Sequence, residues 1–316
     1  MPVTQSQKVF LMAIAVFTIS AYSQGANVKV NCNSATSTIS GAVKALKPDE
    51  SSTIEVSGHC KENVLIQGFE RLTLISNSAA TITDVSGGLG TVVDIEDSHV
   101  TLQGFTINGG DTAVACGSAS VCYLTGNTVQ AVVGQEAVRV DGSHAFLANN
   151  IIQNNADRGM TIKDGAVVSS SFDIFQGNAG ITAGGITLIS GGYLVAGSSI
   201  VKNNGGVAGI LATSHSTVRL VSCTVSDNSE DGINLRGSSE ARFESISGPV
   251  TVTGNGGSGV NIDDLSFALF QGATVTGNLG GTDVLCNPQF SATRGALTDI
   301  GGGKTNCVEP AKGKTP

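Results

Sequence analysis

One short pattern recurs along most of the chain, and this repeat limits the possible folds more than any other feature of the sequence. Apolar residues recur at steps of 22 to 27 residues, at Ile107, Val129, Ile152, Phe175, Ile200, Val225, Val252 and Val275. Segments such as Gly159-Met160-Thr161-Ile162 follow, in which apolar residues alternate with polar ones, so each repeat contains strands with one buried face. The repeat predicts an elongated parallel β-solenoid with one repeat per coil.

An asparagine stands three residues after each of the last six apolar positions. These residues are Asn155, Asn178, Asn203, Asn228, Asn255 and Asn278. Equivalent residues of stacked coils lie about 4.8 Å apart, so the six amides are predicted to form a hydrogen-bonded ladder at one corner. The composition fits a narrow core, with 42 Gly, no Trp and only 4% aromatic residues.

From about Asn27 to Cys307, the repeat and the caps described below resemble the right-handed parallel β-helix proteins of the pectin-lyase-like superfamily. Counting the early strands and the aligned repeats gives an all-β helix of about ten coils. The resemblance implies right-handed coiling and a helical cap at the amino-terminal end. It does not identify a reaction, because this fold is shared by lyases, hydrolases, esterases, epimerases and adhesins.

The two ends of the chain differ from the repeat. Lys8, a short apolar run and Ala21-Tyr22-Ser23 predict an export signal over residues 1–23, and the run is too short to span a membrane. Residues 24–50 are predicted to form an amino-terminal cap that contains a helix. The β-helix is expected over residues 51–278, a carboxyl-terminal cap over 279–307, and a disordered tail over 308–316.

All seven cysteines lie in the predicted mature chain, where an oxidising environment favours disulfides. The predicted pairs are Cys32 with Cys60, Cys116 with Cys122, and Cys286 with Cys307. For Cys116 and Cys122, two buried thiols fit the coil geometry almost as well as a bridge. Cys223 is left over, in a corner column with Asn127, Asn150, Asp173 and Ser198. Because no histidine stands in an adjacent column, Cys223 is not predicted to be a catalytic nucleophile.

The net charge of −8 becomes −9 when the signal with its single Lys8 is removed. An acidic body repels nucleic acid, so nucleic-acid binding is not expected. An acidic polysaccharide would be repelled as well unless a divalent cation bridged the two. The mature chain is expected to be a monomer without a membrane span, located in the periplasm or outside the cell.

Charged residues gather on the outward positions of the early coils. Arg139, Asp141 and Lys163 are predicted to lie within about one coil spacing of one another, with Asp94 and Glu96 two coils below. Asp94, Glu96 and Asp141 could bind Ca²⁺ while the cationic groups hold a substrate acid, which is the arrangement that a β-elimination needs. A row of surface ion pairs explains the same residues without any function, and we favour that interpretation.

A second group, Asn261-Ile262-Asp263-Asp264 with Arg236 one coil below, is similar to the polygalacturonase pattern. That family also has a histidine and an Arg-x-Lys sequence, and both are missing here, so we assign no hydrolase activity. Tyr123 and Tyr193 are the only tyrosines of the predicted mature chain. This scarcity weighs against tight glycan recognition, which usually uses aromatic rings.

The sequence therefore predicts an exported binding or structural protein, non-enzymatic or vestigial, that interacts with glycans or with cell-surface proteins. The alternative is a carbohydrate-active enzyme, most plausibly a Ca²⁺-dependent polysaccharide lyase that acts through Arg139, Asp141 and Lys163.

Overall fold

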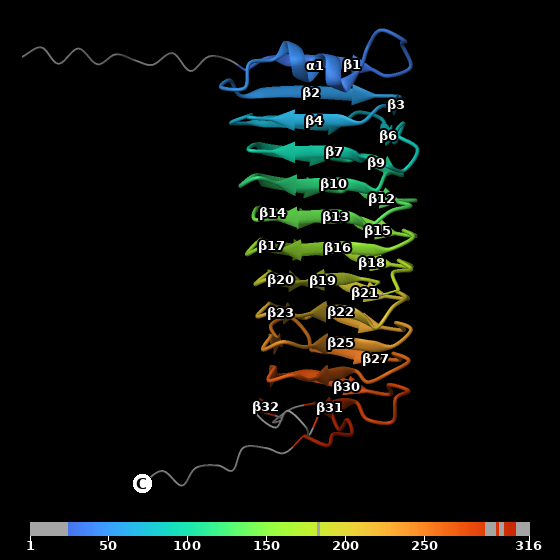
Figure 1. Cartoon of the computed structure of the whole chain (residues 1–316), viewed down its shortest axis with the longest axis vertical. Helices are drawn as coiled ribbons and strands as arrows, with labels where there is room; N and C mark the ends of the chain where they lie inside the picture. The colour runs from blue at the N-terminus through green and yellow to red at the C-terminus, as the bar shows by residue number, and fades with distance from the viewer. Residues whose placement is uncertain (1–24, 182–183, 288–294, 297–299, 308–316) are drawn as a thin grey trace, which may run out of the picture.

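Three parallel sheets run the length of a stack of coils (Figure 1). The computed structural model describes residues 25–181, 184–287, 295–296 and 300–307. These residues form one sheet of twelve strands and two sheets of ten strands, and neighbouring strands pair in parallel. The all-β parallel helix of about ten coils that the repeat predicts is confirmed.

The sheets are named here by their terminal strands. The β1–β32 sheet contains β1 (Asn27–Asn31), β2 (Ser52–Ser57), β5 (Leu72–Ser76), β8 (His99–Gln103), β11 (Val121–Thr125), β14 (His144–Ala148), β17 (Val167–Ser171), β20 (Tyr193–Gly197), β23 (Thr217–Val221), β26 (Glu240–Glu244), β29 (Phe267–Gln271) and β32 (Gly295–Ala296). The β4–β31 sheet contains β4 (Val64–Gln67), β7 (Thr91–Glu96), β10 (Thr112–Gly117), β13 (Glu136–Asp141), β16 (Arg158–Lys163), β19 (Ile186–Leu188), β22 (Ala208–Ala212), β25 (Asp231–Leu235), β28 (Val260–Ile262) and β31 (Val284–Cys286). The β3–β30 sheet contains β3 (His59–Lys61), β6 (Thr81–Thr83), β9 (Thr106–Asn108), β12 (Thr128–Gln130), β15 (Ile151–Gln153), β18 (Ile174–Gln176), β21 (Ile200–Lys202), β24 (Thr224–Ser226), β27 (Val250–Thr253) and β30 (Ala273–Thr276).

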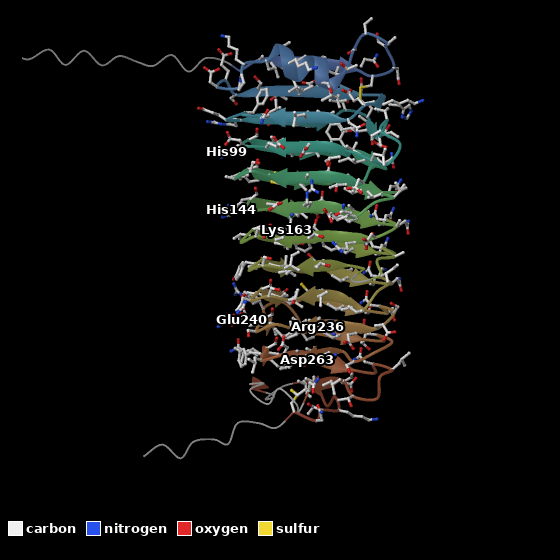
Figure 2. All side chains as sticks on the ribbon, viewed as in Figure 1. His99, His144, Lys163, Arg236, Glu240 and Asp263 are labelled. Carbon is white, nitrogen blue, oxygen red and sulfur yellow. A yellow bond between two sulfur atoms is a disulfide. The ribbon has the colours of Figure 1, made fainter. Side chains whose placement is uncertain are left out.

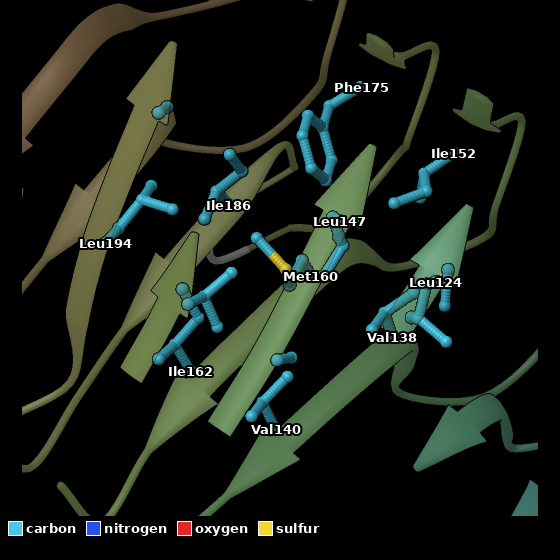
Figure 3. Close-up of a cluster of buried hydrophobic side chains, with 14 of the residues drawn as sticks. Leu124, Val138, Val140, Leu147, Ile152, Met160, Ile162, Phe175, Ile186 and Leu194 are labelled. Carbon is cyan, nitrogen blue, oxygen red and sulfur yellow. The ribbon is translucent and has the colours of Figure 1, made fainter. Parts of the chain in front are cut away.

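Each coil turns its alternate side chains inward, and stacked coils place like residues above one another. Val138, for example, pairs with Val114 on one side and with Met160 on the other, and all three are buried. Figure 3 shows how such residues from successive coils fill the interior. The inward columns are mostly apolar, with exceptions such as the buried Ser170. A shift of register by one residue would turn them toward water, and this fixes the outward columns too.

An asparagine ladder runs along the corner that follows the β3–β30 sheet. The Nδ2 of each asparagine donates to the Oδ1 of the next, through Asn155, Asn178, Asn204, Asn228, Asn255 and Asn278. The prediction of Asn203 was wrong. Val201, not Ile200, pairs with the inward Phe175, so the ladder position falls on Asn204, while Asn203 is exposed with φ of 54°. The left-handed conformation thus belongs to the residue before each ladder asparagine.

A second column of polar side chains follows the β1–β32 sheet. Asn127 donates to Asn150, and Asn150 donates to Asp173, whose own amide donates to the hydroxyl of Ser199. Ser199 therefore takes the place predicted for Ser198, which has φ of 51°. The column ends at Cys223, which is buried and free.

The amino-terminal end is covered by helix α1 (Ile39–Ala45), which lies across the first coil (Figure 1). The side chain of Thr38 caps the helix by accepting from the amide of Gly41. The Glu62 carboxylate accepts from the amides of Ile39 and Ser40, so it satisfies two further free donors of the first turn. Ile39 is buried on the helix face that meets the β-helix core.

Three disulfides join Cys32 to Cys60, Cys116 to Cys122, and Cys286 to Cys307. The first and last hold the two ends of the β-helix, and the second decides between the two interpretations of Cys116 and Cys122. The predicted signal at residues 1–23 and tail at 308–316 lie outside the described residues. None of the described helices is long and apolar enough to cross a membrane.

Candidate functional site

The outer face of the β4–β31 sheet carries the charged residues that the sequence singled out. In the paired strands, Arg139 lies between Ala115 and Thr161, and Asp94 lies beyond Ala115. Asp141 pairs with Lys163, as the column alignment predicts. Figure 2 shows Lys163, Arg236 and Asp263 along this face. We call the group on its early strands the charged cluster: Asp94, Glu96, Glu136, Arg139, Asp141, Arg158 and Lys163.

Glu136 holds the centre of the charged cluster, and sequence reasoning missed it. The residue is only 3% exposed. Its Oε1 lies 3.4 Å from Nη1 of Arg139, and its Oε2 lies 3.6 Å from Nη1 of Arg158. The Thr161 hydroxyl also lies 3.4 Å from Oε2, as a donor. Burial raises the pKa of Glu136, and the nearby Arg139 and Arg158 oppose that rise. The carboxylate therefore holds two arginines of adjacent coils in place.

Asp94 lies half-buried beside Arg139 in the same cluster. Burial raises its pKa, the Glu96 carboxylate raises it further, and the Arg139 guanidinium acts in the opposite direction. Between Asp94 and Arg139 the small side chain of Ala115 is almost completely covered, at 2% exposed. Asp94 and Arg139 thus lie on the two strands that flank Ala115.

Lys163 is paired with acidic neighbours. Its Nζ lies 2.9 Å from Oδ2 of Asp141 and 3.9 Å from Oδ2 of Asp164. All three side chains are partly exposed, so water screens the attraction. Lys163 is therefore one member of a row of ion pairs on this sheet face.

The three carboxylates proposed for Ca²⁺ are not brought together. Within the described residues, the only group of three possible ligand atoms within 4.8 Å of one another comes from Cys32, Cys60 and Glu62. Those two cysteines form a disulfide. Of the proposed ligands, Glu96 accepts from the Gln67 amide and Asp141 pairs with Lys163.

Farther along the same face the surface is hollowed into a groove of about 600 Å³, which we call the Arg236 groove. Its floor is formed by Asn234, Arg236 and Asn261, from the outer side of the sheet and the residue after β25. Its wall comes from the segments before the strands, with the exposed Ile181 and Glu230, and from Asp231 at the start of β25.

A chain of hydrogen bonds orients Arg236. Asp231 Oδ2 accepts from Nδ2 of Asn234 at 2.7 Å, and Asn234 Oδ1 accepts from Nε of Arg236 at 2.8 Å. Asp231 also accepts from Nδ2 of Asn261 and from the Ser258 amide, so its carboxylate is fixed on both oxygens. Among the ion pairs of the described residues, none involves Arg236.

The sequence pointed to Arg236 and Asn261 but gave no weight to Asp231 and Asn234. Asn234 and Asn261 pair in adjacent strands, so the column alignment contained this signal. Asp231, the first residue of β25, was missed because its role depends on contacts with the next coil, where it bonds across 27 residues to Ser258 and across 30 residues to Asn261.

The comparisons with known proteins agree with this architecture. A family described as the right-handed β-helix region matches residues 91–247. The chain is a right-handed β-helix protein of the pectin-lyase-like fold. Pectate lyase Pel9A is 11% identical, with 81% of this chain and 78% of the lyase aligned at a TM-score of 0.56. The A-module of the Azotobacter vinelandii mannuronan C-5 epimerase AlgE4 is 10% identical. The alignment covers 86% of this chain and 93% of the module, with a TM-score of 0.62.

The A-module of the Azotobacter vinelandii mannuronan C-5 epimerase AlgE6 is 12% identical. The alignment covers 86% of this chain and 91% of the module, with a TM-score of 0.62. No curated protein matches the sequence significantly. At such identities the similarity establishes the fold alone, so function has to be argued from the site itself.

Proposed function

We propose that this is an exported protein that binds a carboxylate-bearing polysaccharide along the outer face of the β4–β31 sheet. The observation that carries the proposal is Arg236, a guanidinium without an ion pair among the described residues, held in place at the floor of a groove. A guanidinium binds a carboxylate through two parallel hydrogen bonds, and orientation before binding reduces the entropy lost.

The groups around Arg236 suit the rest of a sugar. The partly exposed Asn261 and Asp231 offer amide and carboxylate atoms to hydroxyls, while the buried Asn234 only positions Arg236. Exposed Ile181 offers apolar surface at the rim. A long, straight sheet face also suits a linear polymer. The fold neighbours named a pectate lyase and a mannuronan epimerase support this substrate class, because pectate and mannuronan are polymers of uronic acids.

Export is part of the proposal. Three disulfides are typical of proteins in an oxidising compartment and support the signal proposed for residues 1–23. The acidic net charge of the chain should make binding of an acidic polymer depend on salt and on divalent cations. At low salt the net charge of −9 that is expected after removal of the signal opposes an acidic polymer, so Ca²⁺ is expected to strengthen binding by bridging carboxylates.

Calorimetric titration with oligogalacturonate and oligomannuronate tests this function, with and without Ca²⁺. Arg236→Ala should weaken binding at least tenfold, because a charge-assisted contact contributes roughly 1.5–3 kcal/mol. Arg242→Ala is the matched control, since Arg242 is an exposed arginine on the β1–β32 sheet. Equal effects of the two variants, or binding to neither oligosaccharide, would show that the groove is not the site.

One observation favours a second candidate, a polysaccharide lyase that acts at the charged cluster. Asp94 and Glu136 have raised pKa values beside Arg139, and carboxyls with perturbed pKa values gather at sites of proton transfer. In this candidate, Arg139, Asp141 and Lys163 are the catalytic groups. A bound Ca²⁺ would have to draw together the carboxylates of Asp94, Glu96 and Asp141, which do not form a ligand group in the described structure.

An ultraviolet assay for unsaturated products on the same oligosaccharides distinguishes the two candidates. A lyase should give product that is lost on chelation and in Asp141→Ala. If the oligosaccharide binds at saturation and no product forms with Ca²⁺ present, the lyase candidate fails while the binding function stands.

A further inference from the structure

The outer face of the β1–β32 sheet carries an uncharged band in its middle coils. None of the outward-facing residues of β8, β11, β14, β17 and β20 is Asp, Glu, Lys or Arg. Charged residues return at both ends of this sheet, in the ion pairs Lys29–Glu55 and Arg219–Glu244. On a chain with a net charge of −8, a long uncharged stretch of surface is a distinct feature.

Exposed aromatic side chains gather in this band. The rings of Tyr123 and Phe146 stack on adjacent strands with centroids 5.0 Å apart and an interplanar angle of 12°, and each residue is 43% exposed. Tyr193 lies two strands farther along the same sheet, partly exposed. The two tyrosines thought too few for glycan recognition therefore lie on one face, together with an exposed phenylalanine.

Core packing does not account for the exposed stack. The chain stacks Phe243 on Phe270 in the same way, with centroids 4.6 Å apart, but buries both rings completely. The neighbours of the exposed pair in its column are Thr101 and Ser169, whose side chains are much shorter than a ring. The outward ring faces at the two ends of the stack are therefore open to contact.

The size of the band indicates what kind of partner it fits. Five strands about 4.8 Å apart, each about 16 Å long, give roughly 400 Å². A stable protein interface needs about 800 Å² on each partner, so the band alone is too small for a second protein. It is large enough for one extended chain, and the absence of charge favours a neutral one.

We propose that this band binds a neutral, linear polysaccharide, with Tyr123 and Phe146 as its main contacts. Aromatic rings pack against the apolar C–H faces of sugars, while the hydroxyls of Thr101, Ser169 and Tyr193 can bond to sugar hydroxyls. The site is separate from the Arg236 groove, because it lies on another sheet, and the floor of the groove belongs to the later strands β25 and β28. In Figure 2, His99 and His144 of this sheet lie at one side, apart from Lys163 and Arg236.

Titration with hexasaccharides of β-linked glucose, mannose and xylose tests the proposal. Saturable binding to at least one is expected, and Tyr123→Ala/Phe146→Ala should weaken it at least tenfold. Phe172→Ala is the matched control, because Phe172 is an exposed phenylalanine at a corner outside the band, and it should bind as the wild type does. Arg236→Ala should also bind these neutral sugars normally, which separates this site from the groove.

A second variant tests the proposal even if the first variant fails to fold. Ser169→Glu places a charge beside the stack without removing any core atom, and it should reduce binding to the same extent. Failure to bind any of the three hexasaccharides, or normal binding by both variants, would overturn the proposal. So would sedimentation that shows a dimer lost in Tyr123→Ala/Phe146→Ala, because a second copy would then cover the band.

Discussion

The charged cluster and the Arg236 groove lie on the same sheet and use the same residue types, but they neutralise charge differently. In the cluster, Arg139 and Arg158 share the buried Glu136, and Lys163 faces Asp141. In the groove, Arg236 is oriented by the neutral Asn234, and the nearest fixed carboxylate, Asp231, is one hydrogen bond farther away. The difference teaches that a cation held by amides stays available to an external anion, whereas a cation held by a carboxylate is already satisfied.

The largest expected effect comes from removing the carboxylate that fixes the groove. Asp231→Ala leaves the buried Nδ2 of Asn234 and the amide of Ser258 without their acceptor. Unsatisfied buried donors are costly, so the free energy of unfolding should fall by about 2 kcal/mol. Denaturant titration measures it, and Glu230→Ala, an exposed neighbour in the same groove, should cost almost nothing. Equal losses would mean that the Asp231 bonds do not organise the groove.

Much of this fold could be predicted from the sequence, because the inward columns are mostly apolar and fix the register of every outward column. The same logic failed at Ile200, where two adjacent apolar residues allow two alignments and Val201 is the inward one. Glu136 was not found because its burial depends on Arg158 and Thr161 of the next coil. The groove was not found because non-periodic segments form most of its wall, and periodicity carries no information about them.

The next prediction compares how much Arg139 and Arg236 each contribute to the stability of the fold. Arg139→Ala leaves the buried Glu136 with one guanidinium fewer, and the unfolding free energy should fall by about 1–2 kcal/mol. Arg236→Ala removes no ion pair, and it should change the unfolding free energy by no more than about 0.5 kcal/mol. Thermal and denaturant unfolding of both variants and of the wild type measures these differences in unfolding free energy. A larger loss in Arg236→Ala would reverse the comparison between cluster and groove.

A smaller effect is the pH dependence of the cluster. The folded protein raises the pKa of Glu136 above its ordinary value of 4.5, because burial disfavours the charged form. The carboxyl thus contributes stability that is fully present below pH 4.5 and is lost as the pH rises through its folded pKa. Glu136→Gln does not titrate, so its stability relative to the wild type should improve as the pH rises toward neutrality. A relative loss over this range would show that the arginines outweigh burial.

The smallest effect is expected at Lys163, whose ion pairs are partly exposed. Lys163→Met keeps most of the side chain but removes the charge that faces Asp141 and Asp164. Exposed pairs contribute little, so the unfolding free energy should change by no more than about 0.5 kcal/mol, and added salt should shrink the difference further. A loss well above that, insensitive to salt, would mean that Lys163 is bound as firmly as Arg139. Lys163 would then be one of the charged side chains that stabilise the fold. The Arg236 groove would be the part of this sheet face that can bind a ligand.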